Sequence, residues 1–411
     1  MRRLAFPAVL LVTTVSLGAD WARFRGPNGT GSAAGKLPDI NPKSPTWKTA
    51  IPGEGVSSPI VVGGKVFVQS AAKDGSKRVL VCLDATSGKI EWTKDVPGHA
   101  AKKHANNSYA SGTPTSDGKL VYCAWWDGDA MSLAAYDFSG NEKWIASLGS
   151  YISDHGAGHS PVVHDGTVYL NADGSKDLGG HATLVAFDAA TGQKKWAVER
   201  PAHRASFSTP FVWERPGKGT ELVVGTTTEI TGYDPASGKA NWTHPIEWSG
   251  AKMKLRVVGS PVAVGGLIVC PSGDGGGARY MLGIDPSGDS PKKVWDRKND
   301  GTPYVPCLLT KDGLLFWMGD NGVAACADPK TGGRVWEERV TTKEVMSSPI
   351  LAGDEVLSIA MTGEFYVFKA AREYELVRRG SLGEPVSATP ALADGRLYVR
   401  GGTHLFCFGA K

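Results

Sequence analysis

The sequence predicts an all-β fold, an eight-bladed β-propeller with four antiparallel strands in each blade. Three observations lead to it. One short motif ends a unit that recurs along the chain, a second motif opens each unit, and a lone tryptophan segment stands before the first unit. The composition agrees, because 53 glycines, 25 prolines and 41% apolar residues are typical of many short strands joined by turns.

The motif that ends each unit is a short strand, an aspartate, a turn with glycine and a strand with tryptophan, as in LDATSGKIEW at residues 83–92. The aspartate can accept hydrogen bonds from the turn, and glycine supplies its left-handed residue. A tryptophan at a fixed place in an outer strand can pack between neighbouring blades. A seventh copy, ending at Val377, has lost both the aspartate and the tryptophan of the motif. The docking tryptophans predicted from the motif are Trp92, Trp144, Trp196, Trp242, Trp295 and Trp336.

The motif that opens each unit is a pair of small residues, a proline and an apolar strand. It is followed by an apolar run after glycine, as in GGKVFVQS, so each unit encodes four strands. The opening motif occurs eight times, which sets the number of blades. Its prolines are Pro59, Pro114, Pro161, Pro210, Pro261, Pro306, Pro349 and Pro390.

The two ends of the chain predict how the ring closes. The eighth unit opens at Pro390 and stops after HLFCFGA, without its last strand. Trp47, in SPTWKTAIPG, lies one repeat length before Trp92. We therefore expect the strand around Trp47 to complete the eighth blade, which removes an open sheet edge that would invite aggregation. The propeller then spans residues 45–411, after an N-terminal extension at 20–44.

Residues 1–19 are typical of a signal peptide, with Arg2 and Arg3 before an apolar stretch and small residues at its end. We expect an exported protein, periplasmic or extracellular, with no transmembrane segment after cleavage; an uncleaved signal anchor is the alternative. The net charge of +4 comes without any run of basic residues, which argues against nucleic-acid binding. We expect a monomer.

Six cysteines lie singly in apolar, strand-like runs such as VLVCLD. An even number in an exported protein is compatible with disulfides. Cysteine is also a common small buried hydrophobe, and no two of these are adjacent or spaced C-x-x-C. The interpretation that we favour is mostly free, buried thiols.

Together these motifs resemble the PQQ-like, tryptophan-docked propeller repeats, whose architecture is similar to that of the WD40 and YVTN propellers. The opening WARFRGPNGTG (residues 21–31) and the stretch HGAGHSPVV are similar to a group of exported propellers common in planctomycetes. More distantly, the chain resembles the outer-membrane assembly lipoprotein BamB and the PQQ-dependent dehydrogenases. No cysteine lies near the predicted cleavage point, so the sequence does not support a lipid anchor like that of BamB.

The resemblance to PQQ dehydrogenases implies requirements that this sequence does not meet. Such enzymes bind a quinone with Ca²⁺, and many pack two adjacent cysteines on it; this chain has no adjacent pair. We therefore expect no cofactor, neither PQQ nor Ca²⁺, and no metal site. The spacing of His155 and His159 suits one helical turn, but the intervening GAG argues against a helix. The glycine-rich runs at 26–31 and 272–279 lack the features of a phosphate loop.

Long polar stretches precede several innermost strands, and in a propeller such loops converge on the mouth of the central channel. Solvated loops with no binding role are the plain alternative, but surplus loop length often serves function. The candidate residues for binding a ligand or partner are His104, Asn107, Tyr109, His155, His159, Arg204 and Arg256.

Two functions follow as hypotheses. The first is a non-catalytic binding or assembly scaffold that uses the channel-mouth loops to recognise an envelope protein, a peptide or a glycan. The second is an oxidoreductase or other enzyme with its site at the channel mouth. The folded positions of His104, His155 and His159 discriminate between them, because an enzyme at the mouth would need these side chains to converge.

Overall fold

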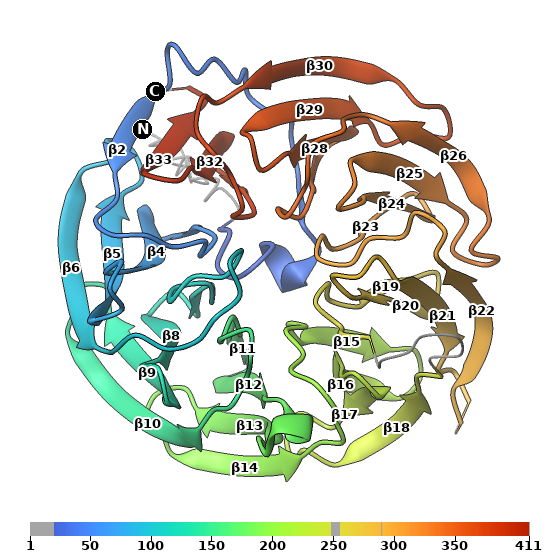
Figure 1. Ribbon diagram of the computed structural model, residues 1–411, viewed down its shortest axis with the longest axis horizontal. Coiled ribbons are helices and arrows are strands. Elements are labelled where there is room, and N and C mark those ends of the chain that lie inside the picture. Colours follow the sequence, from blue (N-terminus) through green and yellow to red (C-terminus); the bar gives the residue numbers. More distant parts are fainter. Residues whose placement is uncertain (1–19, 248–254, 289, 411) are drawn as a thin grey trace, which may run out of the picture.

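The computed structural model describes residues 20–247, 255–288 and 290–410. Eight β-sheets surround a central channel, as the sequence predicted (Figure 1). Seven sheets have four strands, and the seventh blade has a fifth. The predicted signal peptide lies outside the described residues.

Each blade is an antiparallel meander whose first strand lies at the channel and whose last strand lies at the rim. The first four blades consist of β3 (Ile60–Val62), β4 (Lys65–Ala71), β5 (Lys77–Asp84) and β6 (Ile90–Pro97); β7 (Thr115–Ser116), β8 (Leu120–Trp126), β9 (Ala130–Asp137) and β10 (Glu142–Ser150); β11 (Val162–His164), β12 (Thr167–Asp173), β13 (Ala182–Asp188) and β14 (Lys194–Glu199); and β15 (Phe211–Arg215), β16 (Gly219–Gly225), β17 (Glu229–Tyr233) and β18 (Ala240–Pro245).

The last four blades repeat the arrangement, and only the seventh and eighth receive strands from the N-terminal part of the chain. Their strands are β19 (Val262–Val264), β20 (Leu267–Gly273), β21 (Arg279–Asp285) and β22 (Lys292–Lys298); β23 (Leu309–Lys311), β24 (Leu314–Met318), β25 (Val323–Ala327) and β26 (Arg334–Arg339); β27 (Ile350–Ala352), β28 (Glu355–Ile359), β29 (Glu364–Lys369) and β30 (Leu376–Ser381), with β1 (Ser32–Ala33) beside β27; and β31 (Ala391–Ala393), β32 (Arg396–Arg400) and β33 (His404–Phe408), completed by β2 (Trp47–Ala50).

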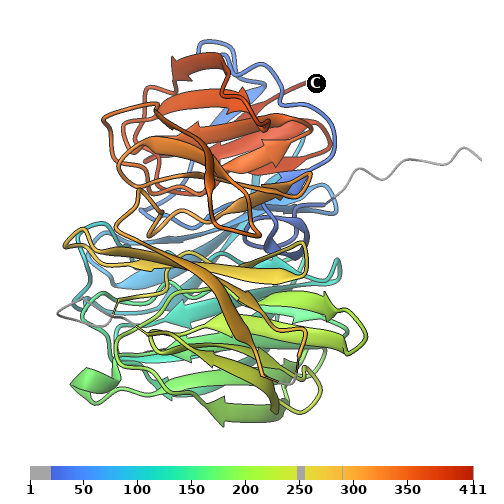
Figure 2. The ribbon, with the colours of Figure 1, turned by 90° about the vertical axis from the view of Figure 1, so that its right-hand side faces the viewer.

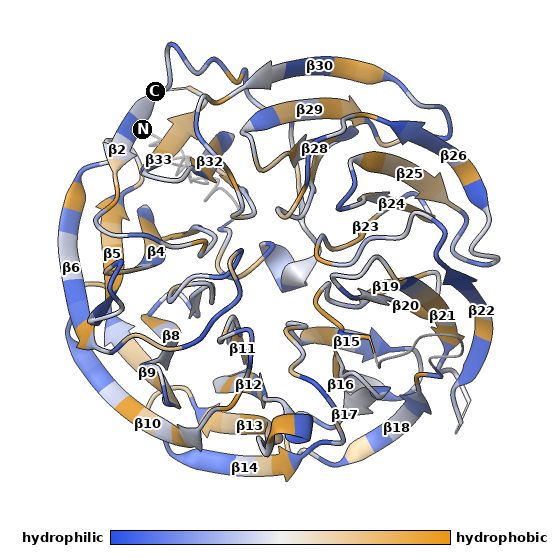
Figure 3. Ribbon diagram, viewed as in Figure 1, coloured by the Kyte–Doolittle hydropathy of each residue, from blue (hydrophilic) through white to orange (hydrophobic). Residues whose placement is uncertain are grey.

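Hydrophobicity divides each blade into an apolar interior and a polar rim. The two middle strands are buried on both faces, and β24 (LLFWM) is buried along its whole length. The outermost strands alternate instead, as β6 does over eight residues. Figure 3 shows the result, with much orange in the middle strands and rim strands in which blue segments alternate with orange ones. This pattern is what sheets packed face to face around a ring require.

The ring closes through β2, as the sequence predicted. This strand pairs antiparallel with β33, and Trp47 lies opposite Cys407. In Figure 1 the blue β2 lies beside the red β33, which brings the two ends of the chain into one blade. The pairing gives this blade its fourth, outermost strand and covers the edge of β33, so closure is a property of the whole chain.

The repeated tryptophans join successive blades. A carbon side chain on Gly88 (φ +70°) would come within 2.4 Å of the Trp47 ring, so the glycine of the motif provides both the left-handed turn and the surface on which the ring lies. Among the described residues, six tryptophans donate their ring N–H to a backbone carbonyl in the hairpin of the next blade, at 2.6 to 3.1 Å. The pairs are Trp47–Ala85, Trp92–Phe138, Trp144–Ala189, Trp196–Pro235, Trp295–Pro329 and Trp336–Ala371.

Trp242 departs from this pattern, although its motif is complete. Its ring N–H turns back into its own blade and donates to Glu221 Oε2 at 2.5 Å. Arg215 takes the place of the tryptophan at the junction with blade 5, where its Nη2 donates to the carbonyls of Pro286 and Gly288. The same guanidinium pairs with Glu221 at 3.1 Å. At this junction a buried ion pair has thus replaced the tryptophan ring.

A second set of bonds joins the blades close to the channel. The backbone N–H of Ser58 donates to the side-chain oxygen of Thr113 in the next blade at 3.3 Å. Equivalent bonds occur at seven of the eight junctions within the described residues, and we call this set the hydroxyl ring. Its members are Ser58, Thr113, Ser160, Thr209, Ser260, Cys307, Ser348 and Thr389.

Cys307 is the one thiol in the hydroxyl ring, and it changes how the sixth repeat aligns. In the first blade Ser58 is followed by Pro59 and then β3; in the sixth, Cys307 is followed by Leu308 and then β23. The proline that we matched to the opening motif, Pro306, therefore lies before the ring position, where the other blades have proline after it. All six cysteines are free and buried, which agrees with the favoured interpretation of the sequence.

The segment at residues 20–33, part of the predicted extension, lies inside the propeller. Trp21 forms a bridge with Val61, the carbonyl of Ala22 accepts from Ser116, and β1 pairs parallel with β27. The short 3-10 helix η1 (Pro27–Gly29) lies at the centre of the ring in Figure 1. We call residues 20–33 the plug, because they cross the channel and contact blades on several sides of it.

A second 3-10 helix, η2 (Lys176–Leu178), lies between β12 and β13. Within the described residues no helix is long and apolar enough to cross a membrane.

Candidate functional site

The loops that lead into the innermost strands open on one face of the disc. The hairpins between the second and third strands of the blades, including the one that holds η2, open on the same face. Figure 2 shows η2 (green) and the plug (dark blue) towards opposite sides of the disc. The candidate residues of the sequence therefore gather on the face away from the plug.

His104 and His155 come from the loops before β7 and β11, and the structure brings them together. Their imidazole rings stack, with centroids 5.1 Å apart and planes at 8°. Asn107 holds the two loops in register, since its Nδ2 donates to the carbonyls of His155 at 2.6 Å and Ala157 at 3.2 Å. Asn107 is thus a positioning residue, while the ring of His104 is exposed to solvent.

Arg256 reaches the same place from the loop before β19. Its Nη2 lies 3.3 Å from Asp154 Oδ1 and 3.1 Å from Nδ1 of His155, and that Nδ1 lies 2.6 Å from Asp154. Burial lowers the pKa of His155 below its ordinary value, and the positive charge of Arg256 adds to the effect although Asp154 opposes it. At neutral pH the ring is therefore uncharged and can donate from Nδ1 to the ionised Asp154.

Arg204 and Tyr304 complete the cluster from two further loops. Burial lowers the pKa of Arg204, and the neighbouring charge of Arg256 lowers it further. Burial raises the pKa of the Tyr304 phenol, while Arg256 and Arg204 oppose that shift, so the phenol is protonated. The ring of Tyr304 also receives the guanidinium of Arg279 at 5.2 Å. We call His104, His155, Arg204, Arg256 and Tyr304 the mouth patch.

Besides Arg256, which is 2% exposed, two further candidate residues are supports rather than surface. His159 is 2% exposed, its ring packs edge-on against Tyr151, and its Nε2 lies 2.9 Å from the carbonyl of Ser206. Burial lowers its pKa to about 4. Tyr109 binds both backbone groups of Ala101 through its hydroxyl and receives the guanidinium of Arg78 on its ring at 4.6 Å. Both side chains fix the mouth loops to the blades.

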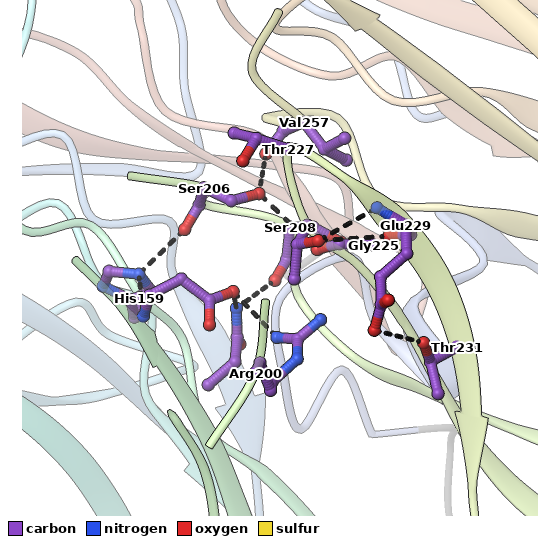
Figure 4. A network of polar contacts seen from close by, with 12 residues as sticks. His159, Arg200, Ser206, Ser208, Gly225, Thr227, Glu229, Thr231 and Val257 are labelled. Atoms are coloured by element: carbon purple, nitrogen blue, oxygen red, sulfur yellow. Dashed lines mark hydrogen bonds and ion pairs between the residues drawn. The ribbon is translucent and has the colours of Figure 1, made fainter. Parts of the chain in front are cut away.

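A buried polar network lies beneath the mouth patch at the junction of blades 3, 4 and 5 (Figure 4). Arg200 pairs with Asp173 at 2.8 Å, and neither side chain is exposed. Burial by itself would lower the pKa of Arg200, and the charge of Asp173 raises it above its ordinary value. Ser206 Oγ donates to the carbonyl of Val257 at 2.7 Å, which ties the loop of blade 4 to that of blade 5. The network holds the mouth loops rigid.

Arg200 is not among the candidate residues that the sequence analysis named, and its burial was missed. One signal was available, because Asp173 is a lone carboxylate at the end of the apolar strand TVYLNAD. A charge buried in such a strand needs a partner of opposite sign. Arg200 follows β14, the second strand after β12, and the pairing of β12 with β13 places it beside Asp173.

Comparison with known proteins places the fold in a family. The family model described as outer membrane protein assembly factor BamB matches residues 30–109, 72–150, 100–316 and 319–410, which is nearly the whole propeller.

The chain belongs to this family. Among BamB proteins, that of Moranella endobia (strain PCIT) is 23% identical over 351 residues, covering 83% of this chain and 82% of that protein. The crystal structure of BamB from Moraxella catarrhalis matches with a TM-score of 0.64 and 13% identity, covering 89% of this chain and 99% of that one. At that identity the structural match shows the shared fold.

Quinone-dependent enzymes also share the fold of the BamB family. The dehydrogenase subunit of the quinone alcohol dehydrogenase of Acetobacter aceti is 28% identical over 207 residues, which cover 44% of this chain and 26% of that subunit. A europium-containing methanol dehydrogenase matches with a TM-score of 0.67 and 14% identity, covering 95% of this chain and 98% of that one.

The donor groups of this chain do not fit the quinone and metal of such enzymes. Within the described residues no three His, Cys, Asp or Glu side chains come together as metal ligands. The carboxylate of Asp154 at the mouth patch is already taken up by His155 and Arg256. No two of the six buried cysteines are adjacent in the sequence, so there is no vicinal pair to pack on a quinone. We derive no reaction through a quinone.

Proposed function

We propose that this chain is an exported, non-catalytic binding scaffold that holds an acidic segment of an envelope protein on its mouth patch. The observation that carries the proposal is the convergence of three separate loops on one rigid face, where His104 and Arg204 reach the surface and the buried Arg256 holds His155 and Asp154 in place. Binding on such a preorganised surface costs little ordering entropy.

The charges of the mouth patch favour an acidic partner. Arg256 and Arg204 lie close enough for each charge to affect the other, and Asp154 is the carboxylate that contacts Arg256 within the described residues. Arg204 is the partly exposed guanidinium of the patch, whereas Arg256 is 2% exposed. Asp154 and Asp274 both lie near enough to Arg204 to affect its charge. A partner's Asp or Glu would bind to Arg204 through charge-assisted hydrogen bonds, and the rings of His104 and Tyr304 would contact its apolar neighbours.

The BamB relatives support the choice of a protein partner. Two BamB proteins, from Moranella endobia and Burkholderia pseudomallei, match over 83% of this chain, and their name describes assembly of outer membrane proteins. The support concerns the class of function, a propeller that binds protein. It extends by inference to an envelope location for this chain.

An enzyme at the mouth is the second candidate, and one observation favours it. The Asp154–His155 contact at 2.6 Å has the form of a base oriented by a carboxylate. The scaffold remains the better account because the ring of His155 is stacked under His104 and lies against the guanidinium of Arg256, so it is held in a fixed array.

The first test places a photo-crosslinking amino acid at His104 in the protein expressed in its native envelope. The control places the same group at Lys330, which is exposed in the hairpin between β25 and β26 on the opposite face. We expect a discrete crosslinked protein from position 104 that is absent at position 330 and lost in the Arg204→Glu variant. Identical crosslinks from both positions would contradict the proposal.

The second test measures binding of a fluorescent twelve-residue peptide that alternates Glu with Phe, against a twin with Gln in place of Glu. We expect the Glu peptide to bind at least tenfold more tightly, and Arg204→Glu to remove the difference. Lys330→Glu is the matched charge change and should have no effect. Equal binding of the two peptides would show that the patch does not recognise acids.

A further inference from the structure

A cavity of about 620 Å³ lies at the other end of the channel, between the plug and the innermost strands of blades 3 to 6. Strands β11 and β15 start at the mouth loops, and the lining residues His164 and Glu214 belong to their far ends. The cavity therefore opens on the face opposite the mouth patch. Its volume is that of a site for a small organic molecule, for which about 300 to 1,000 Å³ is usual.

The plug contributes one buried cation to this cavity, Arg23, which is 8% exposed. Its Nη2 donates to the carbonyl of Pro210 at 2.6 Å. Nε and Nη1 have no hydrogen-bond partner within the part of the chain that the structure describes. Burial lowers the pKa of Arg23 to about 9, and the nearby charge of Arg25 contributes to the shift. The guanidinium is still protonated at neutral pH.

Neither arginine of the plug has a carboxylate partner among the described residues. Arg25 uses its guanidinium to hold the plug together, donating to the carbonyls of Gly29 at 3.0 Å, Thr30 at 3.2 Å and Leu308 of blade 6. Arg23 makes a single such bond among the residues that the structure describes. A buried cation with unused donors is unfavourable unless an anion reaches it. The open side of Arg23 faces the cavity, so this is where the anion would lie.

The walls of the cavity are apolar, which determines the rest of the ligand. The polar groups at its rim are occupied or solvated: Asn28 pairs with both backbone groups of Val212, and Glu214 is exposed and accepts from Thr220 at 2.8 Å. The apolar lining residues come from blades 3, 4 and 5, and they are Val163, Phe211, Val212, Trp213, Pro261, Val262 and Ala263.

We propose that this cavity binds a small carboxylic acid with an apolar body, its carboxylate on Arg23 and its body against Phe211 and Trp213. The arrangement of a mostly apolar concave wall with one placed charge is that of small-molecule sites in general. The negative charge of Glu214 at the rim disfavours acids with a second carboxylate at the far end. The site is separate from the mouth patch, and its test does not depend on the scaffold function.

The test is calorimetric titration of the purified chain with phenylacetate and 3-phenylpropionate, with phenylacetamide as the neutral twin. We expect saturable binding of at least one of the acids and at least tenfold weaker binding of the amide. Arg23→Gln should weaken binding of the acid to the level of the amide. Arg23→Lys should retain part of the preference for the acid over the amide, because it keeps the charge.

Arg23 also holds the plug to Pro210, so its variants could disturb the fold. Ala263→Phe is the second variant, since it fills the cavity from blade 5 without touching Arg23. It should abolish binding of the acid while circular dichroism and the melting temperature stay close to those of the unaltered chain. Equal binding of acid and amide, unchanged binding in Ala263→Phe, or no heat from either acid at its solubility limit would each overturn the proposal.

Discussion

The backbone N–H of Ser260 donates to Sγ of Cys307 at 3.2 Å, across the junction between blades 5 and 6. The backbone N–H of Cys307 in turn donates to the hydroxyl of Ser348 at 3.0 Å. One thiol thus serves in a ring whose other members are hydroxyls. The hydroxyl ring needs a hydrogen-bond acceptor at this place, and either a sulfur or an oxygen atom can supply it.

Cys307→Ser should keep the hydroxyl ring intact and change the unfolding free energy by less than about 1 kcal/mol. Cys307→Ala should leave the buried N–H of Ser260 without an acceptor and cost about 1–3 kcal/mol. Denaturant unfolding of both variants measures the difference. Cys123→Ala, at a buried strand position outside the ring, shows how much of the loss is packing. Equal losses for Cys307→Ser and Cys307→Ala would remove the acceptor role.

Arg215→Met should be among the most destabilising single substitutions in the propeller. It leaves Glu221 buried without its cation and frees two carbonyls of blade 5, for a loss of about 3–5 kcal/mol. The double variant Arg215→Met with Glu221→Gln should recover part of the loss, because the unpaired charge is gone. Arg372→Met, on the exposed surface, is the control. A loss no larger than that of the control would mean that Arg215 does not hold this junction.

The fold could be predicted because its determinants repeat at fixed places in the sequence. Trp47 lies one repeat before Trp92 and marks the closing strand, and β2 does pair with β33. The exchange of roles between Trp242 and Arg215 could not be seen in this way. The motif around Trp242 is complete, and what redirects its ring is Glu221, a residue on another strand whose pairing only the folded blade reveals.

The candidate site was located at the level of loops and not of single side chains. Loop length and polarity pointed to the segments that hold His104 and His155, which the structure stacks. The same criteria selected His159, because a histidine among glycines looks solvated in the sequence while its ring is buried. The plug carries no periodicity, and its partners, such as Leu308 for Arg25, lie far along the chain. Its role in the channel could not be derived from spacing.

Replacing residues 40–52 by a Gly-Ser linker of equal length should open the eighth blade. The edge of β33 would lose its partner strand, and Trp47, Ile40 and Ile51 would leave the core, so we expect aggregation on expression or on mild heating. Light scattering measures it. Lys48→Ala with Thr49→Ala keeps the strand and should remain soluble. A linker variant that stays monomeric and unfolds cooperatively would contradict the role of β2 in closure.

PQQ with Ca²⁺ should not bind at micromolar concentrations. Arginines are present at both ends of the channel, but within the described residues no three metal-ligating side chains converge to hold the cation. Quinone absorbance and calorimetry report binding directly, and a PQQ dehydrogenase reconstituted in the same buffer is the positive control. A saturable signal that requires both components would show that the donor set had been misjudged.

The pH dependence of stability should carry the signature of His159. Its ring is neutral in the folded protein with a pKa of about 4, against about 6.5 for an unfolded histidine, so the unfolded chain binds the proton first. The contribution to stability is complete above pH 6.5 and declines as the pH falls from 6.5 to 4, by up to about 3 kcal/mol. His159→Phe keeps the ring packed against Tyr151 and Phe207 and cannot titrate. The variant lacks the contact with Ser206, so its unfolding free energy should be lower than that of the unaltered chain by a constant amount above pH 6.5. As the pH falls from 6.5 to 4, its unfolding free energy should decrease less steeply than that of the unaltered chain. Parallel profiles of the two proteins between pH 6.5 and 4 would show that His159 is reached by water and takes up its proton in the folded state.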